Sequence, residues 1–323
     1  MKVTRALALA LLIVSMCPAV VFCQDAFPVK PIQIWAGMAP GGTMDTLARA
    51  LAMEAKKHLG QDVVVVNKPG GTGSTASAQV ANAKPDGYTL GLNSSATFTT
   101  VPFLQEMSID LIKENTQIMA FAKFELVIYV RADSPLNSFK DLIEFARKNP
   151  GKLSYGSPGA GTRAHLIMAA IALQEGVEMA HIPFAGEAPT VSAVLGGHIT
   201  AGVHSPTGAI PHIEAGTLKV IGVTGDERMA EFPKVATTNE LGYSYELPVV
   251  ALIHGPKNLP EPIRKKLEDA FEKAANSDSF VDISKKHILY LKKHVFGKDL
   301  ETFLLVERDK TGELIKKLGG LGK

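Results

Sequence analysis

Cysteine is nearly absent from this chain. Of 323 residues only Cys17 and Cys23 are cysteines, and both fall in an apolar N-terminal segment. Once that segment is removed, the chain can form no disulfide and no cysteine-based metal site. The nine histidines show no compact metal-ligand spacing, so we expect no metal and no other cofactor. Core packing alone must stabilise the fold, and the length of the chain makes that feasible.

Neither sign of charge is in excess. The sequence has 34 Lys and Arg against 32 Asp and Glu, and Lys2 and Arg5 belong to the N-terminal segment. Without these two, basic and acidic residues are equal in number. We therefore expect neither nucleic acid nor an anionic membrane as a partner. Tandem repeats are also missing, which excludes solenoid architectures.

Long hydrophobic runs are confined to residues 1–23. A basic start is followed by the apolar run Ala6–Val14, and the segment stays apolar to Phe22. This order is typical of a secretory signal peptide, cleaved after Cys23 or after Ala26. A membrane helix is disfavoured because polar residues and a proline interrupt the run and no stop-transfer charges follow. A lipid anchor on Cys23 is disfavoured because bulky Phe22 precedes it. We expect an exported protein.

What the sequence does contain is one layout used twice. Ile32–Asp45 and Leu153–His165 each read as a short apolar strand, a loop of Gly, Pro, Ser and Thr, and the start of a helix. A glycine-rich loop that opens a helix presents free backbone N–H groups at the positive end of the helix dipole, which favours an anion. Two such loops in two similar domains predict a clamp for a small molecule that carries carboxylates.

Strands and helical patterns alternate along the chain, which predicts an α/β fold with mainly parallel strands. Strands are expected at Ile32–Trp35, Val63–Val66, Tyr88–Leu92, Phe124–Arg131, Ala180–Pro183, Lys219–Thr224 and Leu247–His254, and Leu195–Val203 is expected to be a turn followed by a strand. Helices are expected at Asp45–Leu59, Ser74–Ala83, Phe139–Lys148, Pro262–Ser277 and Lys298–Leu318.

Two of the predicted strands, Phe124–Arg131 and Leu247–His254, bracket the second copy of the layout. We interpret them as crossover strands between two α/β domains. The first domain would be discontinuous, with residues 27–124 and 245–323, and the second would be residues 125–244. A hinge that the chain crosses twice suits a ligand cleft that closes on its contents.

An ordered series of motifs resembles one family, the tripartite tricarboxylate transporter substrate-binding proteins of the Bug/TctC type. The series runs from about Pro28 to the C-terminal helix and includes Ala39–Asp45, Asn67–Gly73, Pro85–Leu90, Asn149–Ser157, Gly159–Thr162 with His165, His181–Phe184, Leu195–Gly197, Pro211–Lys219 and Val223–Arg228. One motif alone would be weak, but their order along the chain makes the resemblance specific.

The resemblance implies a periplasmic, monomeric receptor with a periplasmic-binding-protein fold of type II. Such a receptor delivers a small carboxylate, such as a di- or tricarboxylate, an aromatic acid or an amino acid, to the membrane subunits of a tripartite transporter, and it performs no chemistry. The family commonly grips a carboxylate with backbone groups of the first strand–helix loop and of the glycine-rich loop in the second domain.

Residue types and the resemblance together predict a set of ligand-binding residues. They are Ala39, Pro40, Gly41, Gly42, Thr43 and Asp45 in the first loop and helix, Ser94 and Ser95 at a strand end, Ser157, Gly161, Thr162 and His165 in the second loop and helix, Ala185, Gly186 and Glu187 after the strand that ends at Pro183, and His204. The alternative roles are structural: Asp45 would only favour the helix dipole, Thr162 would be an N-cap, and His165 would pack on its helix.

The chain departs from the family where the far end of a ligand would lie. Thr200 and His204 stand where the family often has acidic residues, and Ala185-Gly186-Glu187 replaces a basic or glycine residue. We expect His204 to favour a ligand with an acidic or acceptor group at its far end, bound more tightly as pH falls through the histidine range. Glu187 would repel an anion unless water or a ligand amine intervened.

Other functions remain open. A secreted hydrolase would use Ser157 and His165, but Tyr155–Gly159 lacks the glycine two places before the serine that a nucleophile elbow needs. Gly71–Ala76 satisfies a relaxed dinucleotide-binding pattern, but the strand that follows ends in Asn93 instead of an acidic residue. A ligand-sensing partner of a membrane signalling protein would use the same pocket as a transport receptor.

Overall fold

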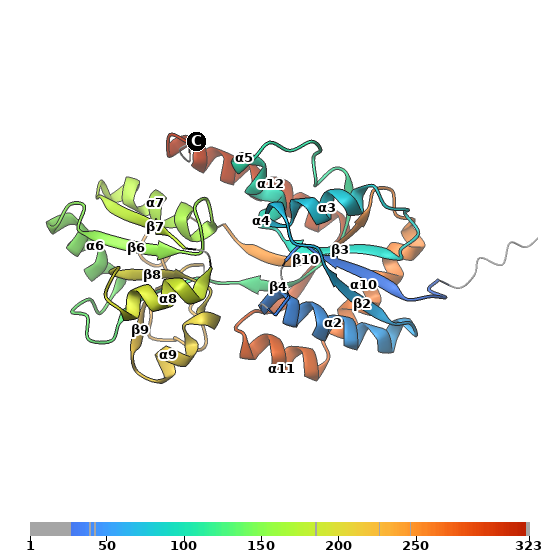
Figure 1. Cartoon of the computed structure of the whole chain (residues 1–323), viewed down its shortest axis with the longest axis horizontal. Coiled ribbons are helices and arrows are strands. Elements are labelled where there is room, and N and C mark those ends of the chain that lie inside the picture. Colours follow the sequence, from blue (N-terminus) through green and yellow to red (C-terminus); the bar gives the residue numbers. More distant parts are fainter. Residues whose placement is uncertain are drawn as a thin grey trace, which may run out of the picture.

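The protein consists of two α/β units, each built on one β-sheet (Figure 1). A computed structural model describes residues 27–320 apart from Ala39, Gly42, Ala185, Asp226 and Glu246. The predicted signal peptide and both cysteines lie outside the described residues.

The first unit has a six-stranded sheet in the order β11-β4-β10-β3-β1-β2. Its strands are β1 (Ile32–Ala36), β2 (Val63–Asn67), β3 (Thr89–Ser94), β4 (Asn115–Phe124), β10 (Val249–Pro256) and β11 (Tyr290–Phe296). Its helices are α2 (Thr43–Leu59), η1 (Gly71–Gly73), α3 (Ser74–Ala81), α4 (Ala96–Thr99), α5 (Val101–Leu104), α10 (Glu261–Ala275), α11 (Asp278–Lys286) and α12 (Gly297–Lys317).

The second unit has a five-stranded sheet in the order β7-β6-β8-β5-β9. Its strands are β5 (Val127–Arg131), β6 (Leu153–Ser157), β7 (Met179–Pro183), β8 (Ala201–His204) and β9 (Leu218–Val223). Its helices are α6 (Phe139–Lys148), α7 (Arg163–Glu175), α8 (Glu187–Leu195), η2 (Pro206–Gly208) and α9 (Ile210–Glu214).

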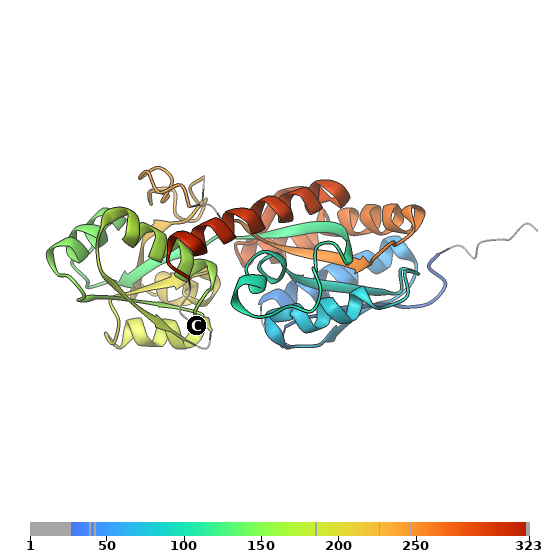
Figure 2. The same ribbon diagram turned by 90° about the horizontal axis from the view of Figure 1, so that it is seen from above.

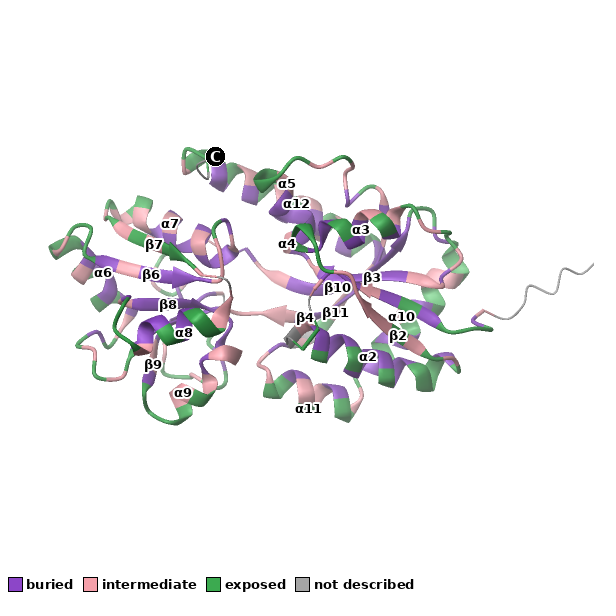
Figure 3. Ribbon diagram, in the orientation of Figure 1, coloured by how far each residue is buried: buried purple, intermediate pink, exposed green. Residues whose placement is uncertain are grey.

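Each sheet is covered by helices on both faces, so each unit has two layers of core. On one face of the first sheet, α2, α10 and α11 pack through apolar side chains such as Leu51 and Phe271 against Ile34. In the second unit, α6 and α7 cover one face, while α8 and α9 cover the other. The buried residues follow the strands and the inward sides of the helices (Figure 3). Apolar residues at helical spacing therefore decide which side of each helix is buried.

Local signals fix where several helices begin and end. Ser138 precedes α6 and its side chain accepts a hydrogen bond from the backbone N–H of Asp141, and Ser277 caps α11 in the same way. α7 ends at Gly176, which has a left-handed φ of 62°. The helix expected over Phe139–Lys148 is found with those bounds.

The expectation of mainly parallel strands is wrong. β1 runs parallel to β2 and β3, and β6 runs parallel to β7 and β8. The strands at the crossovers do not: β10 is antiparallel to β3 and β4, and β5 is antiparallel to β8 and β9. A strand that enters a sheet from the other unit comes from the opposite end, and a fully buried apolar run does not reveal that direction. The expected strand Phe124–Arg131 is also divided, because Glu125 and Leu126 separate β4 from β5.

The units are joined by more than the two crossover segments. Leu300 and Leu304, in the first half of α12, pack in the first unit beside β4, whereas Leu314 and Ile315 belong to the core of the second unit. Figure 2 shows this helix running from one unit to the other, so that the C-terminal end lies at the second unit. The exact domain boundaries expected from the sequence stay a prediction.

Candidate functional site

A cavity of about 480 Å³ lies between the two units and brings together residues that are far apart in the sequence. Five of the predicted site residues line it: Ser94, Gly161, Thr162, Glu187 and His204. A volume of this size is typical of a site for a small molecule.

The two sides of this cavity differ in chemistry. The first unit and the crossover segments supply mostly apolar groups, among them Val101, Leu104, Leu126 and Val249. The second unit supplies the glycine-rich loop, the first turn of α7 and the polar side chains of Glu187, His204 and Ser205. The cavity can therefore hold a molecule with one charged end and an apolar body.

The glycine-rich loop adopts a conformation that requires glycine at Gly161. Its φ is +72°, and a Cβ there would lie 2.7 Å from Cδ2 of Leu104 in the first unit. The missing side chain at Gly161 therefore lets the loop lie close to Leu104 of α5. The Gly161 N–H donates to Nδ1 of His165 at 2.9 Å, so that N–H is not available to a ligand.

The first turn of α7 faces the cavity without a side-chain cap. Thr162 is the N-cap residue but its side chain makes no capping hydrogen bond. Its hydroxyl donates to the Gly159 carbonyl at 2.8 Å. Arg163 and Ala164 follow and line the cavity. Backbone N–H groups at the start of a 13-residue helix present partial positive charge, which favours an anion.

The Arg163 side chain ties this turn to the crossover between the units. It is 8% exposed, and its Nη1 donates to the carbonyl of Phe124, the last residue of β4. Its Nη2 donates to Oγ1 of Thr224 at 3.1 Å and lies 3.6 Å from Oε2 of Glu125. Sequence reasoning missed Arg163, although its place directly after Thr162 at the start of the helix was a usable signal. It also missed Leu104, for which the local sequence gives no signal.

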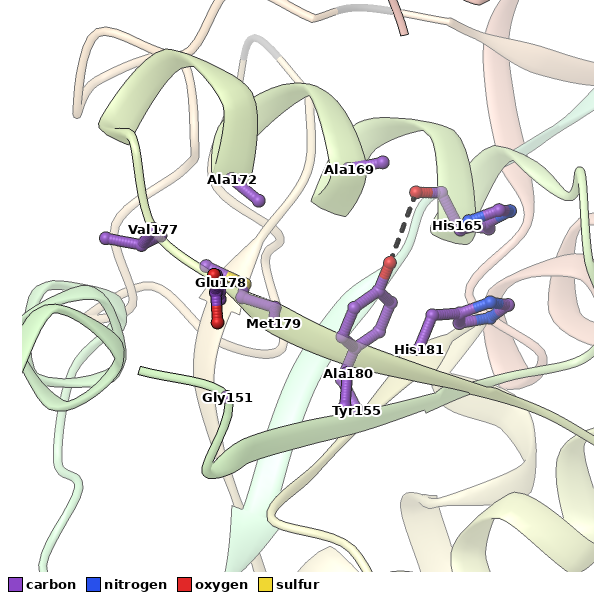
Figure 4. A pocket seen from close by; sticks show the side chains of 10 residues that line it. All are labelled: Gly151, Tyr155, His165, Ala169, Ala172, Val177, Glu178, Met179, Ala180 and His181. Atoms are coloured by element: carbon purple, nitrogen blue, oxygen red, sulfur yellow. Dashed lines mark hydrogen bonds between the residues drawn. The ribbon is translucent and has the colours of Figure 1, made fainter. Parts of the chain in front are cut away.

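Ser157 and His165 brace the glycine-rich loop from behind and do not line the cavity. The rings of His165 and His181 stack with 3.9 Å between centroids and an angle of 8° (Figure 4). Ser157, fully buried, donates its hydroxyl proton to the Gly159 carbonyl at 2.8 Å, and Nε2 of His181 lies 2.7 Å from the same hydroxyl. Burial, with the neighbouring His165, lowers the pKa of His181 to about 4.

This arrangement does not fit the hydrolase alternative. His181, not His165, contacts the Ser157 hydroxyl, and the described hydrogen bonds and ion pairs give His181 no acidic partner that would orient it as a base. Behind the stacked histidines, residues of α7, β6 and β7 line a second, open cavity of about 460 Å³, where the Tyr155 hydroxyl donates to the His165 carbonyl at 3.5 Å (Figure 4).

His204 lines the cavity as a neutral side chain. Its Nδ1 lies 2.5 Å from the Ser205 carbonyl, which can only accept, so Nδ1 carries the proton. Its Nε2 then accepts from the Tyr129 hydroxyl at 2.6 Å. Burial lowers the pKa of His204 to about 4. The expected gain of charge in the usual histidine range is therefore corrected: both nitrogens are engaged, and the proton would enter only in more acid solution.

Glu187 is the acidic side chain among the residues that line this cavity. It is the first residue of α8, and its carboxylate accepts a hydrogen bond from the Gly208 backbone N–H. Burial raises the pKa of Glu187 to about 7, in spite of that hydrogen bond. Gly186 precedes it with a φ of +114°, and Ala185 lies outside the described residues.

In the first loop, Asp45 acts as a brace. It accepts from the Gly41 N–H at 3.0 Å, from Arg49 Nε at 3.0 Å and from Asn67 Nδ2 at 2.8 Å. Burial opposes its charged form, but these hydrogen bonds outweigh burial and lower the pKa of Asp45. Pro40, Gly41 and Asp45 do not line the cavity.

The other predicted residues of the first unit fall into two groups. Thr43 begins α2, while Ala39 and Gly42 lie outside the described residues. Ser94 lines the cavity and accepts from the Ala96 N–H at 3.2 Å, whereas Ser95 is buried and its hydroxyl accepts from the Val250 N–H at 3.0 Å. Ser95 thus joins β3 to the crossover strand β10.

Two further searches concern the described residues only. No three His, Cys, Asp or Glu side chains in that part of the chain come close enough to hold a metal ion. None of its helices has the length and apolar character needed to cross a bilayer.

Comparison with known proteins gives consistent matches over most of the chain. Residues 47–320 match the family described as "Tripartite tricarboxylate transporter family receptor" (TctC). The "UPF0065 protein in gbd 5'region" of Cupriavidus necator is 37% identical over 256 residues, 79% of this chain and 78% of that protein. A solved structure described as a periplasmic transporter is 28% identical with a TM-score of 0.79, covering 92% of this chain and all of the other. The Rpa4515 protein of R. palustris, solved with adipate, is 25% identical with a TM-score of 0.77, covering 91% and 98% of the two chains.

Proposed function

This chain belongs to the receptor family of the tripartite tricarboxylate transporters, a family of periplasmic solute-binding proteins and not of enzymes, and on that premise we propose that it captures one small carboxylate and delivers it to the membrane subunits of such a transporter. The ligand would bind in the cavity between the two units and leave it unchanged.

The observation that carries this proposal is the uncapped start of α7 at the cavity wall. Its N–H groups carry partial positive charge, and the Arg163 guanidinium lies beside them. A carboxylate placed there would gain charge-assisted hydrogen bonds from fixed donors in a partly desolvated site. Val101, Leu104 and Leu126 would then contact the hydrocarbon part of the ligand.

The relatives support the choice of ligand class. The Rpa4515 protein was solved with adipate, an aliphatic dicarboxylate. A cavity of about 480 Å³ is large enough for a molecule of that size. Because the wall provided by the first unit is mostly apolar, we expect the ligand to have an aliphatic or aromatic body.

The first test is binding without turnover. The mature protein should gain thermal stability with some mono- or dicarboxylate, because a ligand at about 100 times its Kd adds about 2.7 kcal/mol to the free energy of unfolding. Mass spectrometry of denatured protein would identify any carboxylate that co-purifies. Consumption of the ligand by catalytic amounts of protein would overturn the proposal.

A second test places a carboxylate of the protein itself at the start of α7. Thr162→Glu should lower ligand affinity at least about tenfold, because the new side chain competes for the same N–H groups, while the free protein stays as stable as the wild type or gains stability. The matched control is Thr162→Gln, which has the same length without the charge and should lose less affinity. If the two variants bind equally well, the carboxylate of the ligand does not lie at this turn.

A further inference from the structure

We propose that Glu187 makes this receptor selective for carboxylates that also carry a protonated nitrogen. The inference rests on the proposed function and concerns the same cavity. It places one end of the ligand at the Glu187 carboxylate in the second unit. The negative charge of this group is opposite to the partial positive charge at the start of α7.

The position of Glu187 is fixed by its surroundings. It opens α8, lines the cavity together with His204 and Ser205, and accepts a hydrogen bond from the Gly208 N–H. A Cβ on Gly208 would lie 3.0 Å from Oε2 of Glu187, so η2 packs directly against the carboxylate. The side chain is therefore held at the cavity wall and does not swing freely into solvent.

The elements that pack against α8 supply no cation at its start. The titratable side chains on them are Tyr129 and Arg131 on β5, Tyr155 on β6 and His204 on β8, and η2 carries none. Tyr129 and His204 are hydrogen-bonded to each other as neutral groups. Arg131, also on β5, lies beside Gly197 just beyond the other end of α8 and is paired with Asp133 at 2.5 Å.

None of the described ion pairs involves Glu187. Among the described residues that line the cavity, Arg163 is the one with a cationic side chain. Arg163 already contacts Phe124, Thr224 and Glu125. A carboxylate in a partly dry cavity without a counter-charge is costly to keep ionised, which agrees with the raised pKa of Glu187. A cation from the ligand would remove that cost.

The cavity therefore has a cationic region and an acidic one. A ligand with a carboxylate at the start of α7 and an ammonium group at Glu187 would satisfy both. A ligand with two carboxylates would have to bind with Glu187 protonated. The two classes predict opposite pH dependence: the affinity for an ammonium carboxylate rises as Glu187 ionises near pH 7, and the affinity for a dicarboxylate falls over the same range.

The experiment compares matched ligands by isothermal titration calorimetry on the mature protein. β-Alanine, 4-aminobutanoate and 5-aminopentanoate are each paired with the dicarboxylate that has the same number of methylene groups: succinate, glutarate and adipate. We expect at least one amino compound to bind about tenfold or more tightly than its partner just above pH 7, with a preference that weakens as pH falls.

The variant Glu187→Gln should abolish this preference. Its amide oxygen can still accept from the Gly208 N–H, so the local structure is kept while the charge is removed. The matched control is Glu214→Gln on α9, where the side chain is exposed and the change in net charge is the same; it should bind as the wild type does. The pH dependence of the wild type is a second readout that needs no variant.

The outcomes separate this inference from the proposed function. If wild-type protein prefers a dicarboxylate and Glu187→Gln leaves that preference unchanged, the inference is wrong and the proposed function stands. If the amino compound is preferred equally by wild type and Glu187→Gln, Glu187 is not the selective residue. If none of these six compounds binds, the inference is wrong, while the proposed function is decided by the thermal-stability test with a wider set of mono- and dicarboxylates.

Discussion

Acid should destabilise this protein through His204, a neutral histidine that is 1% exposed. A second ring proton would have to go on Nε2, which now accepts from Tyr129. Burial lowers the pKa of His204 to about 4, against 6.5 for the ordinary side chain. The unfolded chain therefore takes up the proton first as pH falls. The stabilisation is complete above about pH 6.5 and is lost progressively toward pH 4.

The size of this effect follows from the difference between the two pKa values. One unit of pH is worth about 1.4 kcal/mol for a single group that is protonated only in the unfolded state. Between about pH 7 and about pH 5, His204 should thus account for a loss of about 2 kcal/mol in the free energy of unfolding. His254, fully buried with a pKa lowered by burial to about 3, adds a similar loss. Glu187 acts in the opposite direction, because its raised pKa of about 7 lets the folded chain take up that proton first as pH falls. The change in the wild type is therefore the net of several groups, and only the difference between the wild type and a His204 variant measures His204.

Replacing His204 by Asn isolates the contribution of this side chain. The variant should be less stable than wild type near neutral pH, because the bond to Tyr129 is altered, but its loss on acidification should be smaller by about 2 kcal/mol. Urea unfolding followed by circular dichroism at the two pH values measures both quantities. The control is His58→Asn, at an exposed position on α2, which should show the wild-type loss. Equal losses in wild type and His204→Asn would refute the reasoning.

Two further predictions concern the loops. Gly161→Ala should lower the free energy of unfolding in urea by about 1–3 kcal/mol because of its left-handed φ, and it should weaken carboxylate binding. Adding Leu104→Ala should recover the part of the lost stability that is due to the 2.7 Å contact. The part that is due to φ should remain. Full recovery in the double variant would show that φ at Gly161 is unimportant. Asp45→Ala leaves the N–H of Gly41 and the amide of Asn67 without their acceptor, so the midpoint of thermal unfolding should fall with a loss of about 1–3 kcal/mol; an unchanged midpoint would contradict the role of Asp45 as a brace.

Elements with strong local signals could be predicted from the sequence. The helix Phe139–Lys148 has an N-capping serine and a regular apolar face, and the predicted bounds agree with those found. Helix α11 and strand β11, which follow Ala275, were not predicted, because short segments of mixed polarity carry little periodic signal. The direction of the crossover strands could not be predicted either, since it depends on which unit the chain enters from.

The sequence by itself determined the twofold strand–loop–helix layout, the family resemblance and the identity of the two loops. Glycines, capping residues and apolar spacing act over a few residues, so they can be recognised without the fold. Only the tertiary structure decided which residues of the second loop face the cavity. Gly161 and Thr162 face the cavity, whereas Ser157 and His165, in the same stretch, are turned toward His181. Which groups pack behind a loop depends on distant segments, and local sequence does not specify it.

The same reason explains the protonation of Glu187 and His204. Sequence alone indicated that Glu187 and His204 were unusual at their positions. Their protonation is set by burial and by partners from other segments: Gly208 beside Glu187, and Tyr129 beside His204. Desolvation is a property of the assembled cavity, so only the folded chain could decide that the histidine stays neutral and that the pKa of the glutamate is raised.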